Sequence, residues 1–181
     1  MRDGMLRPAT MDDADQISGL MRASIAAIFP RFYDERQTAS SIVHVGRLDP
    51  AIIADGTYLV HEAGGRVVAC GGWSRRGRLY MGSGDRADDD RLLDPASEAA
   101  HIRAMFVDAG WTRRGLGRAI LEACRAAARA EGFTRLDLMA TLPGVPLYKA
   151  FGFVEVERAK VTLPDGVVMD AVAMERPAEM A

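Results

Sequence analysis

One continuous stretch of this chain constrains its fold more than any other part of the sequence. It begins with the apolar run HIRAMFV (101–107), passes through the turn TRRGLGR (112–118) and continues into the alanine-rich segment AILEACRAAARA. Alternating apolar residues are typical of a strand, whereas alanine, leucine and arginine favour a helix. The stretch therefore predicts a strand, a tight turn and then a helix from Arg113 to Arg129.

The arginines and glycines of this turn suit a phosphate group. The first N–H groups of a helix have no intrahelical partner and carry partial positive charge, so an anion binds there readily. Gly115 and Gly117 let the backbone approach a bulky phosphate, and its oxygens can pair with the side chains of Arg113, Arg114 and Arg118. A solvated basic turn between a strand and a helix explains the same residues equally well, so this motif alone leaves both interpretations open.

Two common nucleotide-binding patterns do not fit the turn. A mononucleotide P-loop needs Lys-Ser or Lys-Thr after its last glycine, but Arg118 and Ala119 follow Gly117 here. A dinucleotide fingerprint needs a third glycine, and Ile120 occupies that position. Nucleotide-dependent kinase and dehydrogenase functions are therefore disfavoured.

The other segments predict a mixed α/β protein without the strict βαβ alternation of a doubly wound fold. They predict a strand at LRPAT, helices in MDDADQISGLMRASIAAIF, DERQTASSIVHVG and DPAIIADG, and a hairpin in TYLVHEAGGRVVACGGWSRR. After the central stretch they predict a strand at TRLDLMA, a short helix at VPLYKAF and strands at GFVEVERAKVTL and VVMDAVAMER. No linker separates two cores, so we expect a single domain spanning residues 1–181.

Composition and charge disfavour several other classes of protein. The formal net charge of −2 gives no reason to expect a nucleic-acid or membrane partner. The chain has no apolar run of membrane-spanning length and no signal-peptide pattern, so we expect a cytoplasmic protein. Cys70 and Cys124 lie in apolar segments, which is typical of buried thiols. The acidic segment DRADDDRLLD (85–94) lacks the glycine and the terminal glutamate of a calcium loop, so we expect no metal site.

Three motifs together resemble the GCN5-related N-acetyltransferase family. The turn TRRGLG is similar to the family signature [Gln/Arg]-x-x-Gly-x-[Gly/Ala], with Thr112 in place of the usual Gln or Arg. HIRAMFV resembles the family's fourth strand, and PLYKAFGF (146–153) resembles its later Leu-Tyr-x-x-x-Gly-Phe element. The motifs follow the family's order, and the resemblance is best between Thr57 and Val156.

The resemblance implies the acyl-CoA N-acyltransferase fold, which is a mixed, mostly antiparallel sheet of about seven strands with helices on both faces. It also implies acetyl-coenzyme A as the acyl donor. The diphosphate would bind at Thr112, Arg113, Arg114, Gly115, Leu116, Gly117 and Arg118. The pantetheine arm would run beside Met105, Phe106 and Val107, in a slot opened where a bulge separates the fourth strand from the next.

The implied reaction transfers the acetyl group to a primary amine, most simply that of a small molecule. It needs a neutral amine, an N–H donor for the oxyanion and an acid for the departing thiolate. The resemblance assigns the donor to the backbone of Val107 and the acid to Tyr148, which also lies beside the cofactor. His101 occupies the place of a glutamate that some relatives use as a base, and an imidazole with a pKa near ~6.5 can take that role.

The role of His101 stays open. A histidine that only hydrogen-bonds its neighbours explains His101 as well as a catalytic base does. Strand alternation predicts that one face of the strand carries His101, Arg103, Met105 and Val107.

The acceptor amine is expected to contact Phe29–Tyr33, Trp73 and the loop from Tyr80 to Asp94. A non-catalytic domain that binds or senses acyl-coenzyme A is the alternative function, because one fold can serve several functions. The presence of Tyr148, the expected acid, favours the catalytic function over the binding domain. Many relatives dimerise, and the final strands are candidate contact surfaces for a homodimer.

Overall fold

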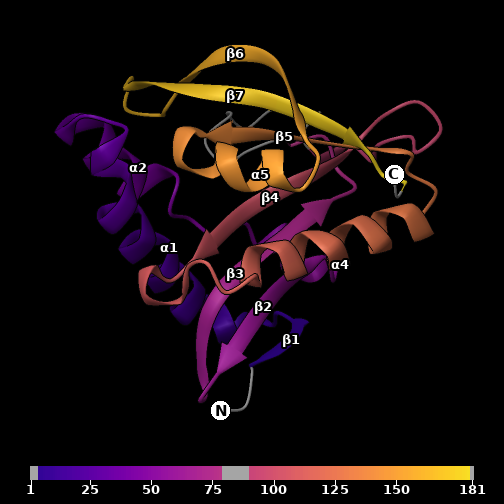
Figure 1. The fold of residues 1–181 in the computed structure, drawn as a ribbon, viewed down its shortest axis with the longest axis horizontal. Helices are drawn as coiled ribbons and strands as arrows, with labels where there is room; N and C mark the ends of the chain where they lie inside the picture. The colour runs from indigo at the N-terminus through magenta and orange to yellow at the C-terminus, as the bar shows by residue number, and fades with distance from the viewer. Residues whose placement is uncertain (1–3, 79–89, 180–181) are drawn as a thin grey trace.

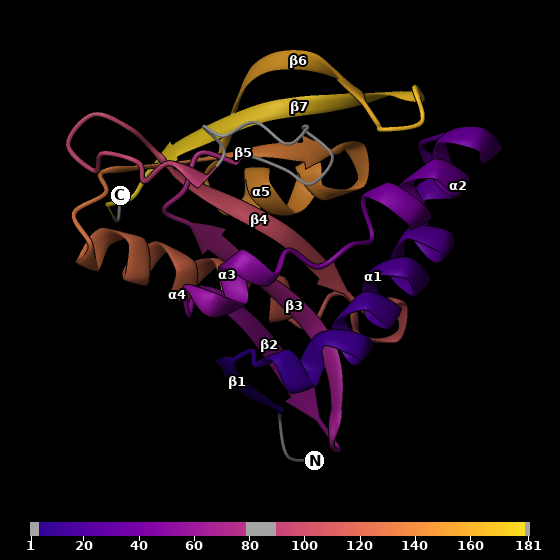
Figure 2. The ribbon, with the colours of Figure 1, turned by 180° about the vertical axis from the view of Figure 1, so that it is seen from behind.

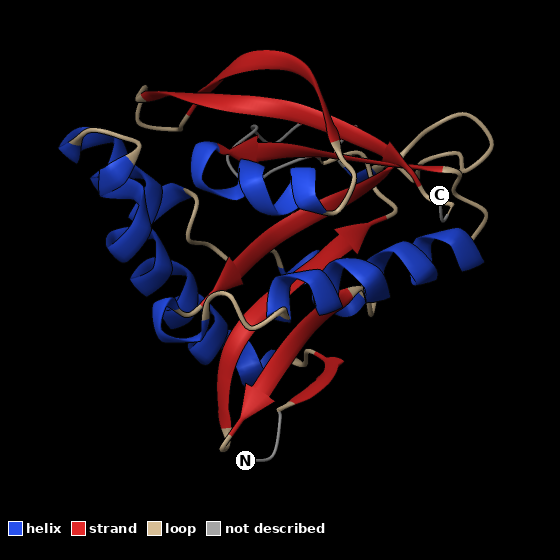
Figure 3. Ribbon diagram, viewed as in Figure 1, coloured by secondary structure: helices blue, strands red, loops and turns tan. Residues whose placement is uncertain are grey.

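A seven-stranded sheet runs through the centre of the computed structural model, which describes residues 4–78 and 90–179 (Figures 1 and 3). The strands are β1 (Met5–Pro8), β2 (Tyr58–Ala63), β3 (Arg66–Ser74), β4 (Ala100–Val107), β5 (Arg135–Thr141), β6 (Val154–Thr162) and β7 (Val168–Pro177). Their order across the sheet is β1-β2-β3-β4-β5-β7-β6, and β4 with β5 is the parallel pair among antiparallel neighbours. The prediction of a mixed, mostly antiparallel sheet is confirmed.

Helices cover both faces of this sheet. They are α1 (Ala14–Ile28), α2 (Glu35–His44), α3 (Pro50–Ala54), α4 (Leu116–Ala130) and α5 (Val145–Ala150). Figure 1 shows α4 and α5 on one face, and Figure 2 shows α1, α2 and α3 on the other. Within residues 4–78 and 90–179, no helix has both the length and the apolar character needed to cross a bilayer.

Each face of the sheet has its own apolar core. Ile120, Leu121 and Cys124 of α4 are fully buried against the strands on one face. On the other face, Ile17 and Met21 of α1 pack in a cluster with residues of β2 and β3. Helical spacing of apolar residues in both helices therefore produces the two layers that hold the sheet between them.

The predicted hairpin forms β2 and β3, and glycine shapes it at two places. Gly64 and Gly65 in the turn both have positive φ, of 58° and 76°, as the favoured two-residue hairpin turn requires. Further along β3, a Cβ on Gly72 would lie 2.4 Å from the carbonyl oxygen of Thr57 and 2.8 Å from the Cα of Tyr58. Only glycine lets the two backbones approach this closely.

Adding one methyl group at Gly72 is therefore expected to destabilise the fold. We expect Gly72→Ala to lower the free energy of unfolding by about 1–3 kcal/mol, because the atoms in its way are backbone atoms that cannot move aside cheaply. Gly19→Ala is the matched control, since a Cβ there meets no atom within 4 Å and lies inside α1. The control should raise stability by about 0.5–1 kcal/mol, because alanine favours the helix. Urea unfolding of both variants checks the opposite signs, and equal effects would contradict the explanation.

Candidate functional site

The candidate site lies where β4 and β5 separate. The two strands pair at Ala100 with Leu136 and at His101 with Asp137, and no further pair follows. Beyond this vertex, Ala104 has a φ of 52°, and the register between β3 and β4 shifts by one residue. These are the marks of a β-bulge, which bends a strand away from its neighbour. The slot implied by the family resemblance is therefore present.

The bulge is held by a buried tyrosine of β2. The hydroxyl of Tyr58 donates a hydrogen bond of 2.7 Å to the carbonyl oxygen of Ala104. Tyr58 is fully buried, so this contact is shielded from water. A left-handed backbone at a residue other than glycine costs roughly 1–2 kcal/mol, and such a fixed partner offsets part of that cost.

The same bulge makes one sequence prediction wrong. Strand alternation predicted one face for His101, Arg103, Met105 and Val107, but the inserted residue exchanges the faces beyond Ala104. Met105 and Val107 pack in the cluster under α4. Arg103 is buried on the opposite face, where its guanidinium donates to Asp49 at 3.3 Å.

Beyond the bulge, backbone groups of β4 face the opening. The N–H of Asp108 donates to the carbonyl of Val68 on β3 at 2.9 Å. Because hydrogen-bonding directions alternate along an antiparallel pair, the N–H and C=O of Val107 point away from β3. The carbonyl of Val107 accepts a 3.3 Å hydrogen bond from the hydroxyl of Ser24 on α1, which agrees with that direction. β5 has already separated, so the N–H of Val107 has no strand partner on that side.

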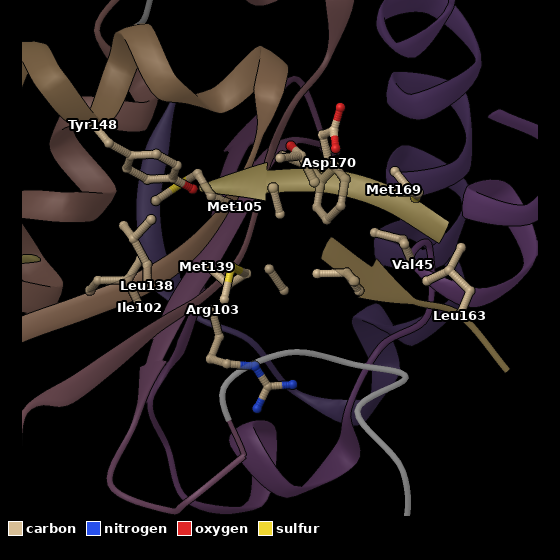
Figure 4. A pocket seen from close by; sticks show the side chains of 15 residues that line it. Val45, Ile102, Arg103, Met105, Leu138, Met139, Tyr148, Leu163, Met169 and Asp170 are labelled. Carbon is tan, nitrogen blue, oxygen red and sulfur yellow. The ribbon is translucent and has the colours of Figure 1, made fainter. Parts of the chain in front are cut away.

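A cavity of about 110 Å³ occupies the opening (Figure 4). It is lined by Val45, Ile102, Arg103, Ala104, Met105, Phe106, Leu138, Met139, Thr141, Tyr148, Val161, Leu163, Met169, Asp170 and Ala171. Of the residues predicted for the site, Met105, Phe106 and Tyr148 therefore meet in one cavity. Much of the remaining wall comes from β6, β7 and the end of α2, whose sequences gave no sign of this role.

Tyr148 reaches this cavity from α5. Its ring packs edge-on against Phe153, with the ring centres 5.8 Å apart. Figure 4 shows the hydroxyl directed into the cavity on the side of Met105. The hydroxyl forms no hydrogen bond with the residues that the structure describes, and burial raises the pKa of the phenol well above its usual value. Tyr148 is therefore protonated at neutral pH and its proton is available to a ligand.

The arginine-glycine turn follows β4 after Asp108 and a short 3-10 helix at Ala109–Trp111, at the open end of the slot. The helix α4 begins at Leu116 and not at Arg113 as predicted, because Arg113 and Gly115 have φ values of 63° and 79° that a right-handed helix excludes. Within the described part of the chain no side chain caps the N-terminus of α4, so its first N–H groups are available to an anion. Arg113 and Arg114 are exposed beside them, and the guanidinium of Arg114 lies 4.4 Å from the ring centre of Trp111.

The two glycines of the turn have different structural reasons. Gly115 has a positive φ, and a Cβ there would meet no atom within 4 Å. The backbone at Gly115 is thus open to a bulky group. Gly117 is buried, and its Cβ would lie 2.9 Å from the side chain of Leu147 on α5. Gly117 therefore allows α4 to pack closely against the helix that carries Tyr148.

His101 lies at the vertex of the slot and does not line the cavity. Its Nδ1 is hydrogen bonded to the carboxylate of Asp137, directly across from it on β5. Val107 lies six positions after His101, which at the rise of a strand is roughly 15–20 Å. The ring thus reinforces the last pairing of β4 with β5, far from the backbone groups that face the opening.

The three segments expected to contact the acceptor have different outcomes. Trp73 is buried on the α4 face, where its ring packs against Phe133 at 5.8 Å, so its predicted role as a pocket wall is wrong. Residues 79–89 of the loop from Tyr80 to Asp94 lie outside the described part of the chain. Tyr33, from the Phe29–Tyr33 segment, contacts two elements beside the cavity.

Comparison with known proteins decides the family. The sequence matches the model of the acetyltransferase (GNAT) family over residues 22–153. The chain is a member of the acetyltransferase (GNAT) family. No curated protein has significant sequence similarity to it.

Several solved acetyltransferase structures share the whole fold. A GCN5-related N-acetyltransferase from Rhodopseudomonas palustris is 21% identical, with a TM-score of 0.74, and the match covers 98% of this chain and 97% of the other. The PaiA N-acetyltransferase from Thermoplasma acidophilum, in complex with coenzyme A, is 12% identical, with coverage of 97% and 99% and a TM-score of 0.68. The YncA protein from Salmonella typhimurium, a structure with acetyl-CoA, is 17% identical, with coverage of 99% and 96% and a TM-score of 0.64. The likeness establishes the acyl-CoA N-acyltransferase fold.

In this GNAT fold, Tyr33 connects two segments that lie beside the cavity. Its hydroxyl donates to the carbonyl oxygen of Asp170 on β7 at 2.7 Å and accepts from the N–H of Leu142, after β5, at 2.9 Å. Tyr33 itself follows α1 and is buried. One side chain thus connects the α1–α2 turn to both strands that flank the cavity.

Removing the hydroxyl of Tyr33 is therefore expected to destabilise the protein. We expect Tyr33→Phe to lower the free energy of unfolding by about 1–3 kcal/mol, because two buried backbone groups lose their partner. Tyr148→Phe is the matched control, since it removes a hydroxyl without a partner among the described residues and should change stability by less than about 0.5 kcal/mol. Urea unfolding measures both, and a Tyr148→Phe variant as unstable as Tyr33→Phe would contradict this account of the hydroxyls.

Proposed function

We propose that this GNAT protein transfers the acetyl group of acetyl-coenzyme A to a primary amine of a small molecule, in a single domain that spans residues 1–181. The observation that carries the proposal is the opening between β4 and β5. It brings the hydroxyl of Tyr148, which has no partner among the described residues, and the backbone edge of β4 to one cavity. The N-terminus of α4, which no described side chain caps, follows β4 in the chain. The solved relatives that contain coenzyme A or acetyl-CoA support the same donor.

The residues around the turn fit the donor. In the proposed complex the diphosphate accepts N–H groups at residues 112–118, and its charge is balanced by Arg113, Arg114 and Arg118. The pantetheine arm lies along β4, where main-chain groups of Met105 and Val107 continue the sheet in place of β5. The pantetheine contacts supply partners for backbone groups that the separated strands leave unpaired, and the diphosphate does the same for the first N–H groups of α4.

The reaction then uses two groups of the chain. The lone pair of the neutral amine forms the new C–N bond while the carbonyl electrons move to oxygen, and the N–H of Val107 donates to that oxygen. When the C=O bond re-forms, the C–S bond breaks and the thiolate takes the proton of Tyr148. The nitrogen loses its proton to water, and Tyr148 regains one from solvent, so the sum is an amide and a free thiol.

The role of His101 as a general base stays a prediction, and its position argues against it. The ring lies at the vertex, bonded to Asp137 and outside the cavity lining. We assign His101 to the positioning of β4 against β5 and leave removal of the amine proton to water.

Loss of the Tyr148 hydroxyl is expected to slow the chemical step. We expect Tyr148→Phe to lower kcat about 10²–10⁴-fold, the usual contribution of a positioned acid, with the affinity for coenzyme A unchanged. His101→Ala is the comparison and should leave the shape of the pH–rate profile unchanged. Thiol release in the presence of amines measures both variants. Unchanged turnover in Tyr148→Phe would remove it as the acid, and coenzyme A binding without any thiol release would favour a sensing domain.

Donor binding is expected to depend on charge at one end of α4. We expect Arg114→Ala to weaken coenzyme A binding about tenfold, because one charge-assisted hydrogen bond to the diphosphate is lost. Arg129→Ala is the matched control, since Arg129 is exposed in the last turn of the same helix. Titration calorimetry with coenzyme A separates the two variants. If Arg129→Ala weakened binding as much as Arg114→Ala, general charge attraction would replace the specific site.

A further inference from the structure

We propose that the acceptor is a primary amine carried on an uncharged apolar body, such as an alkylamine or arylalkylamine, and not a polyamine. This inference rests on the proposed function and narrows it to a substrate class. It is carried by the chemistry of the cavity wall on the side opposite Tyr148.

The two ends of the cavity are lined by different kinds of side chain. Tyr148 and Met105 lie together at one end, which is where the thioester must be for the tyrosine to protonate its sulfur (Figure 4). The amine and its body must then occupy the rest of the space. Figure 4 shows Val45, Leu163 and Met169 gathered at the other end.

The charged residues of the wall do not favour a second cationic group. Asp170 belongs to the wall, but its side chain is half-exposed and its carboxylate already forms a 2.5 Å ion pair with Lys160. Arg103 also lies on the wall, and its guanidinium is paired with the carboxylate of Asp49 at 3.3 Å. Among the described residues of the lining, no other acidic side chain is present. An ammonium at the far end would therefore lose water without gaining a carboxylate, which is costly.

The size of the cavity also suits a compact apolar group. Its volume of about 110 Å³ is of the order of the apolar cavity that holds one benzene molecule. Each methylene that a longer amine buries there gains about 0.8 kcal/mol, which equals about a fourfold change in an equilibrium constant. The selectivity of the enzyme should thus follow chain length.

The first experiment compares amines of matched length on the intact protein with acetyl-CoA. We expect kcat/KM to rise about fourfold per methylene from propylamine to hexylamine, until the cavity is filled. Adding a second ammonium to the terminal carbon of hexylamine, as in 1,6-diaminohexane, should lower kcat/KM by about 100-fold or more. Equal or better turnover of the diamine would overturn the proposed class.

The second experiment changes the charge of the far end. Val45→Asp puts a carboxylate at the cavity wall and should lower kcat/KM for hexylamine about tenfold while raising it for 1,6-diaminohexane. Val43→Asp is the matched control, because Val43 lies two positions earlier, is 59% exposed and does not line the cavity. It should change neither value more than about twofold. A Val45→Asp variant that folds, binds coenzyme A normally and keeps the preference for hexylamine would also overturn the inference.

The outcomes separate this inference from the proposed function. If amines release thiol but diamines are the better substrates, the enzyme stands and the apolar class is wrong. If coenzyme A binds and no amine of either series releases thiol, amine acetylation is wrong. Calorimetry of hexylamine with the coenzyme A complex then tests the cavity directly. An affinity that rises about fourfold per methylene supports the apolar site, and absence of binding overturns it.

Discussion

The whole arrangement depends on β4 and β5 ceasing to pair after two residues. A strand inside a sheet that loses its neighbour exposes backbone N–H and C=O groups, and leaving such groups buried without partners costs free energy. Here the bulge at Ala104 imposes the separation, and the hydroxyl of Tyr58 stabilises the bulge by donating a hydrogen bond to the carbonyl of Ala104. The hydroxyl of Ser24 donates a hydrogen bond to the carbonyl of Val107. The groups of β4 that still need a partner are therefore mainly N–H groups, and a ligand can accept from them.

The elements around this gap are built so that it neither closes nor widens. At the vertex, His101 and Asp137 add a side-chain hydrogen bond to the last backbone pair. On one face, Gly117 lets α4 approach Leu147 and so sets the position of α5 and Tyr148. On the other face, Tyr33 ties the end of α1 to β7 and to the end of β5. Rigid elements thus hold each side of the opening.

Local sequence patterns predicted the parts of this structure that local chemistry determines. The Gly64-Gly65 turn predicted its hairpin, and the motif around Tyr148 predicted a short helix beside the site. The turn before α4 was located correctly, but the helix start was not, because the positive φ of Arg113 has no signal in residue type. Neither Thr112 nor the arginines indicate that the helix starts only at Leu116.

Long-range geometry explains most of what the sequence could not predict. A prediction from alternating residues assumes an unbroken strand. The bulge lies at Ala104, and because no glycine marks its position, the sequence does not indicate that the faces are exchanged there. The far wall of the cavity comes from Val45 and Leu163, which lie more than a hundred positions apart and meet only through the tertiary fold. The sequence predicted an acceptor contact for the Phe29–Tyr33 segment, but Tyr33 does not line the cavity, and its two hydrogen bonds depend on strands near the other end of the chain.

Burial in an apolar cavity also accounts for how the proposed reaction manages without a nearby base. A primary amine in water has a pKa near ~10.4, so roughly one molecule in a few thousand is neutral at pH 7. An apolar wall disfavours the ammonium form and therefore lowers the pKa of an amine that enters it. The same desolvation raises the pKa of Tyr148, so the phenol stays protonated. It also disfavours the charged form of the departing thiolate, which therefore becomes basic enough to take that proton. One physical cause thus prepares the nucleophile and the acid together, and neither preparation requires His101 to reach the cavity.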